Sequence, residues 1–229
     1  MRFLIKFSYD GSSYNGFQTQ KGLETIQEKM EDALKIVNNN QVTPIVATGR
    51  TDKGVHALCQ YGHADIDVNI TEKKLKRALN SNLPDDIHVI FTKIVDKDFH
   101  ARYNVKGKEY QYKINVGEYN PLERNYVFQY NYELDTESMK EAIQVFKGTH
   151  DFRAFVTDNK EKDNCIRTIT EVNIKEENNI ITITFKGDGF LWMAVGPAAC
   201  LLAKTPVETP SIQGSSWAPG QPLKAWEGP

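Results

Sequence analysis

The chain has 229 residues, of which 40 % are hydrophobic and 25 % charged, and its formal net charge at pH 7 is −2. This length suits one large or two small domains, and the composition is ordinary for a soluble globular protein. The sequence contains no apolar run of about 18 residues and no signal-peptide core, so it predicts neither a membrane span nor secretion. Cys59, Cys165 and Cys200 are scattered, which indicates a reducing compartment, and we expect the cytoplasm.

The first half of the chain predicts strands and helices in alternation. Residues 2–9 alternate apolar and polar side chains and predict a strand, which a loop over residues 10–22 follows. Thr25 and Glu28 form a capping box, and apolar residues recur at helical spacing from there to Val37. We expect strands over residues 42–47, 57–66 and 87–95 and a short basic helix over residues 71–80. Residues 48–56 therefore connect two strands, a common setting for functional side chains.

The second half follows a similar order. Residues 108–116 predict a strand, and Asp135 caps a helix that runs to Lys147, where Gly148 ends it. Residues 166–175 and 179–186 predict a hairpin, after which we expect another helix and strand. The predicted fold class is therefore α/β, of the α+β kind, with similar α/β domains at residues 1–103 and 104–191 and a tail at residues 192–229.

The connection at residues 47–57 is the most informative stretch. It reads Ala-Thr-Gly-Arg-Thr-Asp-Lys-Gly-Val-His-Ala and places charged and hydroxyl side chains between two glycines. An aspartate alone in such a turn is usually a local turn former. The whole string, however, resembles the signature of the TruA-type tRNA pseudouridine synthases, which puts Asp52 in the place of the family's nucleophile.

Further stretches resemble the same family, in family order, and together they span residues 1–191. These are residues 7–20, 25–28, 80–87, 99–102, 108–112, 148–152 and 187–191. The resemblance implies the pseudouridine synthase fold, with two sheets joined across a central cleft. It also implies a homodimer that binds tRNA, isomerises uridines of the anticodon stem-loop, and needs no cofactor and no metal.

The resemblance and the placement of charged residues indicate roles for several further residues. Tyr110 matches the substrate-stacking position, although a strand tyrosine that packs in the core is the alternative, as we expect for Tyr112. Arg50, Thr51 and Arg102 are further candidates for substrate contact, with a surface ion pair as the alternative for Arg102. We expect phosphate contacts from a set of basic residues, with a solvated surface as the alternative explanation for their clustering. The set is Lys53, Lys73, Lys74, Lys76 and Arg77.

The motifs end at Leu191. The family continues there with a helix that begins Met-Val-Arg, whereas Gly196 stands near the arginine position and Pro197 follows it. Six of the nine prolines and all three tryptophans follow residue 191, which predicts an aberrant, disordered tail, from a shifted reading frame or a joined segment or as a natural variant. One functional alternative is therefore an RNA-binding remnant with impaired catalysis, and another is an Asp-based hydrolase or metal-binding protein.

Overall fold

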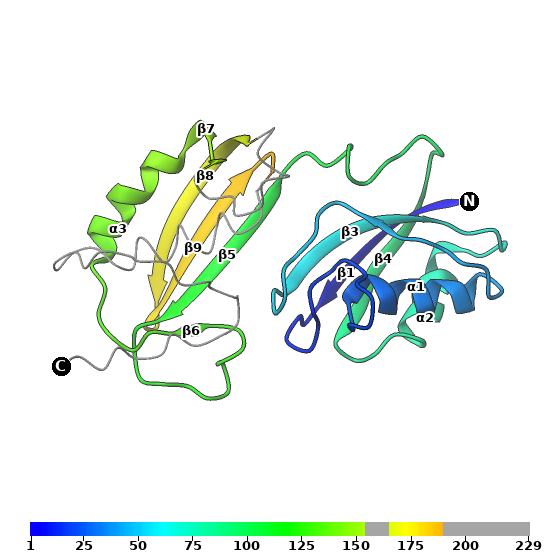
Figure 1. Cartoon of the computed structure of the whole chain (residues 1–229), viewed down its shortest axis with the longest axis horizontal. Coiled ribbons are helices and arrows are strands. Elements are labelled where there is room, and N and C mark those ends of the chain that lie inside the picture. Colours follow the sequence, from blue (N-terminus) through cyan, green and yellow to red (C-terminus); the bar gives the residue numbers. More distant parts are fainter. Residues whose placement is uncertain (154–164, 190–229) are drawn as a thin grey trace. The chain divides into compact units, whose positions relative to one another are not determined.

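The computed structural model describes residues 1–153 and 165–189, which belong to two compact units, one of Met1–Val105 and one that begins at Lys106 (Figure 1). Each unit has its own sheet and at least one helix, so the predicted mixed α/β class is confirmed. The domain boundaries and the joining of the sheets across a cleft stay predictions. The predicted tail at residues 192–229 and the last helix and strand lie outside the described residues.

The first unit is built on a four-stranded antiparallel sheet in the order β2-β3-β1-β4. β1 (Arg2–Tyr9) and β4 (Ile87–Val95) have the predicted bounds, and β3 (Ala57–Asp65) ends one residue early. β1 alternates between half-buried and buried residues along its whole length. This period of two places one face of the central strand in the core.

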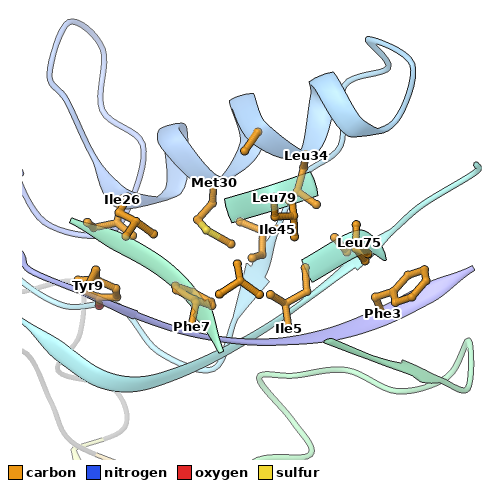
Figure 2. Close-up of a cluster of buried hydrophobic side chains, with 14 of the residues drawn as sticks. Phe3, Ile5, Phe7, Tyr9, Ile26, Met30, Leu34, Ile45, Leu75 and Leu79 are labelled. Carbon is orange, nitrogen blue, oxygen red and sulfur yellow. The ribbon is translucent and has the colours of Figure 1, made fainter. Parts of the chain in front are cut away.

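Two helices contribute to the core of the first unit. Thr25 caps α1 (Ile26–Val37) by accepting a hydrogen bond from the Glu28 backbone N–H, as the capping box predicts, and Thr71 caps α2 (Glu72–Asn80) in the same way. Figure 2 shows side chains of β1 pointing toward those of both helices. The labelled buried side chains are Phe3, Ile5, Phe7, Tyr9, Ile26, Met30, Leu34, Ile45, Leu75 and Leu79.

β2 is much shorter than the sequence predicts. Only Val46–Ala47 pair with β3, whereas a strand was expected over residues 42–47, and the side chain of Val42 is 85 % exposed. Two features explain the difference. Pro44 has no backbone N–H to offer a neighbouring strand, and the Ile45 N–H donates instead to Oε1 of Glu31 at 3.1 Å.

The second unit contains a five-stranded sheet in the order β6-β5-β9-β8-β7. The predicted strand is β5 (Lys108–Asn115), and the predicted hairpin is β8 (Ile166–Glu177) with β9 (Ile180–Gly187). Its turn is Asn178-Asn179, with φ of 51° and 61°, and asparagine tolerates this left-handed conformation better than most residues. Two short edge strands, β6 (Phe128–Gln129) and β7 (Gly148–Asp151), were not predicted.

The helix of the second unit ends earlier than predicted. Asp135 caps α3 (Thr136–Ile143), and the chain then tightens into the 3-10 helix η1 (Gln144–Phe146) instead of continuing to Lys147. The tighter turn places the Phe146 ring 6.5 Å from that of Phe152, nearly parallel to it. Packing of this aromatic pair against the core therefore prevails over regular helix geometry.

Candidate active site

The Asp52 turn, residues 52–55, lies in the connection between β2 and β3. The Val55 N–H donates to the Asp52 carbonyl oxygen at 3.1 Å, and Gly54, at the third position, has φ of +77°. A turn of this kind requires a residue that tolerates positive φ at that position, which explains the glycine. The Asp52 side chain is half-buried at the first position of the turn, whereas the neighbouring Arg50 and Lys53 are exposed.

Gln60 fixes the start of the loop on β3. Its buried side-chain amide accepts a hydrogen bond from the Thr48 hydroxyl at 2.6 Å and donates one to the Gly49 carbonyl at 3.0 Å. The Thr48 N–H also donates to the Tyr61 carbonyl at 2.9 Å. The chain that leads into the Asp52 turn is therefore held to the sheet by three hydrogen bonds.

Thr51 is held by the last residue of β1 and by the loop that follows β1. Its hydroxyl lies 2.8 Å from the Tyr9 hydroxyl, and its carbonyl accepts a hydrogen bond from the Phe17 N–H at 2.9 Å. Gly16, with φ of +90°, approaches so closely that an added Cβ would lie 2.9 Å from the Thr51 oxygen. The predicted contact between Thr51 and the substrate stays a prediction, since the structure assigns this side chain a partner within the protein.

His56 joins the other end of the turn to the same loop. Its Nδ1 atom lies 3.1 Å from the Gly11 nitrogen and 3.0 Å from Oδ1 of Asp10. Asp10 in turn accepts a hydrogen bond from the Ser12 N–H at 2.9 Å. The Asp52 turn is thus bordered on both sides by residues that bond to the loop after β1.

Asp86, which immediately precedes β4, is hydrogen-bonded to two residues of the loop after β1. Its carbonyl accepts a hydrogen bond from the Asp10 N–H at 2.9 Å, and its carboxylate accepts one from the buried Tyr14 hydroxyl at 2.5 Å. Burial and this carboxylate raise the pKa of Tyr14 well above its ordinary value of 10.0. The Tyr14 hydroxyl thus donates to Asp86 and keeps the loop in place.

The other predicted residues lie elsewhere. Lys73, Lys74 and Arg77 are exposed on α2, where Lys76 is half-buried, and Arg102 is exposed in the segment after β4. Tyr110 belongs to the second unit and is half-buried on β5. The structure therefore brings together Arg50, Thr51, Asp52 and Lys53 in one loop, while the meeting of Tyr110 with Asp52 stays a prediction.

Tyr110 and Tyr112 project from the same face of β5 but differ in their surroundings. Tyr112 packs against the buried cluster of the second unit, with its ring 6.3 Å from that of Phe128. Tyr110 is not among the described residues of that cluster. The packing role expected for Tyr112 agrees with this contact, while the substrate contact of Tyr110 stays a prediction.

Sequence reasoning missed the residues that support the Asp52 turn. Tyr9, Gln60, Gly11 and His56 were not assigned to the site, although Gly11 and His56 stand within motifs of the family. Gly11 and His56 are 45 residues apart, and no local periodicity joins them. The one usable signal was the presence of a glycine and an imidazole in two stretches of the same resemblance.

Residues 1–153 and 165–189 contain neither a metal-binding cluster nor a membrane-spanning helix. No group of three or more His, Cys, Asp or Glu side chains there is arranged to hold a metal ion. None of the described helices is long and apolar enough to cross a membrane.

Comparison with known proteins gives consistent results. The family model described as tRNA pseudouridine synthase matches residues 5–104 and 142–206, so the likeness runs beyond Leu191. The chain is 39 % identical over 199 residues to tRNA pseudouridine synthase A of Limosilactobacillus reuteri, which covers 85 % of this chain and 78 % of the relative. It is 45 % identical over 192 residues to tRNA pseudouridine synthase A 2 of Clostridium perfringens. That alignment covers 83 % of this chain and 78 % of the relative.

Proposed function

The chain belongs to the tRNA pseudouridine synthase family, and from this premise we propose that it isomerises uridine to pseudouridine in tRNA, with Asp52 as the catalytic carboxylate. The single observation that carries the assignment of Asp52 is the restraint of its turn. Asp52 is half-buried, and the residues that flank its turn are hydrogen-bonded on both sides: Thr48 and Gly49 to β3, and Thr51 and His56 to the end of β1 and the loop after it. Such a loop holds a reacting group in one geometry.

The reaction breaks the bond between ribose C1′ and uracil N1, turns the base and forms a new bond between C1′ and C5. The C5 hydrogen leaves as a proton and N1 gains one, so no atom is lost and no electron leaves the substrate. We propose that the Asp52 carboxylate acts as the nucleophile, toward the sugar or the base, and it could also serve in the proton transfer.

Binding of tRNA requires contacts beyond this carboxylate. We propose that Tyr110 stacks on the base once it has turned out of the RNA stem, as aromatic side chains do with extruded bases. Arg50 and Arg102 would contact the substrate, and Lys53 and the basic residues of α2 would neutralise phosphates. All of these cationic side chains except Lys76 are exposed, which leaves them accessible to a polyanion.

Three finer assignments complete the proposal. The substrate uridines lie in the anticodon stem-loop, the active form is a homodimer, and the protein works in the cytoplasm. The names of the relatives support a tRNA substrate, and the homodimer rests on the family resemblance. Sedimentation of the full chain at micromolar concentration tests the dimer, which a monomeric species would contradict.

The proposed function is tested with Asp52→Asn, which keeps the size of the side chain and removes its charge. We expect this variant to release no tritium from tRNA that carries uracil-5-³H, while its Kd for tRNA stays near that of the unsubstituted chain. Asp85→Asn, an exposed carboxylate just before β4, is the matched control and should leave both unchanged.

Two outcomes would contradict the proposal. Substantial release by Asp52→Asn would show that Asp52 is not the catalytic carboxylate. Tight binding of tRNA by the unsubstituted chain without any release would identify it as the RNA-binding remnant that the sequence leaves open.

A further inference from the structure

We propose that His56 and Asp10 are positioning residues that hold the Asp52 turn in its reactive place. The proposal rests on the function proposed for Asp52, and neither residue is assigned a contact with the substrate. The two residues lie on the two loops that meet at the site, His56 immediately after the turn and Asp10 immediately after β1.

The Nδ1 atom of His56 has two neighbours within hydrogen-bond distance on the loop after β1. A neutral ring without a proton on Nδ1 accepts a hydrogen bond from the Gly11 N–H, 3.1 Å away, and an imidazolium donates from the same atom to Oδ1 of Asp10, 3.0 Å away. One nitrogen cannot do both at once. Both possible partners of this nitrogen lie on the loop after β1, so the ring is tied to that loop.

Asp10 is itself held in place. Its Oδ1 accepts a hydrogen bond from the Ser12 N–H, and its own N–H donates to the Asp86 carbonyl, both at 2.9 Å. These hydrogen bonds fix the Asp10 carboxylate in its position next to the imidazole. The half-buried state of both residues limits competition from water.

The short connection between His56 and Asp52 transmits this restraint. Val55, the neighbour of His56, donates the hydrogen bond that closes the Asp52 turn, and its own carbonyl oxygen packs directly against Gly11. Moving the imidazole would move Val55 and hence the first residue of the turn. A displacement of a reacting group by about 1 Å can lower a rate by about 100-fold, so a remote imidazole can set the rate without touching the RNA.

The experiment compares His56→Leu, His56→Asn and Asp10→Ala in the full chain, with His88→Leu on the exposed side of β4 as the control. Asparagine places an oxygen near the position of Nδ1, where it can accept from the Gly11 N–H, whereas leucine cannot. Three quantities are measured: the single-turnover rate of pseudouridine formation, the Kd for tRNA and the hydrogen-exchange rate of the Val55 amide.

We expect His56→Leu to lower the single-turnover rate by about tenfold or more and to speed exchange at Val55, with Kd changed by less than about twofold. His56→Asn should recover most of the rate and of the protection. Asp10→Ala should act in the same direction but less strongly, because the Gly11 partner remains. His88→Leu should change none of the three quantities.

Several results would overturn the proposal. An unchanged rate and unchanged Val55 exchange in His56→Leu would do so, as would a loss of rate that His56→Asn does not recover. Loss of rate together with faster exchange throughout β1 and β4 would indicate a role in global stability alone. If the unsubstituted chain forms no pseudouridine, the proposed function fails, and exchange at Val55 in the two His56 variants then decides the positioning contact by itself.

Discussion

The carbonyl oxygen of Val55 lies 2.1 Å from the position that a Cβ on Gly11 would occupy. The oxygen belongs to the backbone, so it cannot turn aside as the end of a flexible side chain would. The loop after β1 and the Asp52 turn therefore meet at a distance that only glycine permits. This contact explains why two stretches far apart in the sequence must match each other in shape.

Gly11→Ala should destabilise the first unit and slow catalysis. The added methyl group overlaps the Val55 carbonyl, and overpacking of this kind costs about 1–3 kcal/mol of the free energy of unfolding. Denaturant unfolding and single-turnover kinetics measure the two effects. Gly107→Ala is the control, since its Cβ would meet the nearest described atom, the Gly187 carbonyl oxygen, at an ordinary 3.4 Å. Equal unfolding midpoints for the two variants would refute the prediction.

We expect Tyr112→Ala to have the larger effect on stability and Tyr110→Ala to have the larger effect on catalysis. Tyr112 packs against the core of the second unit, so its truncation should cost about 1–3 kcal/mol of stability, less than a fully buried aromatic ring. Tyr110→Ala should cost less stability than the loss of a core tyrosine and should reduce turnover far more than Tyr112→Ala. A strongly destabilised Tyr110→Ala would assign that ring to packing instead.

Removal of positive charge from α2 should weaken tRNA binding at low salt. Lys73→Ala with Lys74→Ala removes two exposed ammonium groups, and each lost phosphate contact should make the negative slope of log K against log salt shallower by about 0.9. Filter binding at several salt concentrations measures the slope. Lys35→Ala, an exposed cation in the last turn of α1, serves as the control. An unchanged slope in the double variant would mean that this helix face is only solvated.

His63 should make the first unit less stable in mild acid. Its ring is 5 % exposed, and burial, followed by the charges of Arg2 and His100, lowers the pKa of His63 below its ordinary 6.5. Well above pH 6.5 the ring is neutral in the folded and the unfolded chain, so its lowered pKa has no effect on stability there. As the pH falls from 6.5 toward the lowered pKa, the unfolded chain binds more protons, and the free energy of unfolding decreases.

The comparison with His63→Asn isolates this effect. Nδ1 of His63 accepts a hydrogen bond from the Ala101 N–H at 3.1 Å, and an asparagine oxygen can take its place without titrating. Denaturant unfolding between about pH 7.5 and about pH 5 should show a smaller decrease for the variant. The carboxyl of Asp65, whose pKa the hydrogen bond from Arg2 lowers below 3.8, acts in a separate and more acidic range. Equal pH dependence in both proteins would contradict the prediction.

Much of the first unit could be predicted from the sequence because its signals are local. The alternation in residues 2–9 and 87–95 predicts β1 and β4 with their observed bounds, and the Thr25 capping box predicts the start of α1. β2 was overextended because the apolar pattern of residues 42–47 does not reveal that the Ile45 N–H bonds to a helix side chain. At this position a tertiary contact, and not the local apolar pattern, determines which residues form the strand.

The site was predicted in part for the same reason. The motif around Asp52 identified the loop, and Gly54 indicated a turn. The partners of the turn come from Tyr9, Gly11 and Gln60, whose contacts depend on how β1 and β3 pair. Strand pairing is a non-local property, so no spacing within one stretch of sequence could reveal that His56 faces Asp10.

The contacts described for residues 48–56 also bear on the order of events during protein synthesis. Their partners lie between Tyr9 and Tyr61, and the supporting Asp86 follows soon after, all within Met1–Val105. A chain that grows from its N-terminus therefore has these described contacts around Asp52 available before any strand of the second sheet leaves the ribosome. Because N-terminal units generally fold first, we expect the carboxylate to be in place on the nascent chain while Tyr110 is still to come.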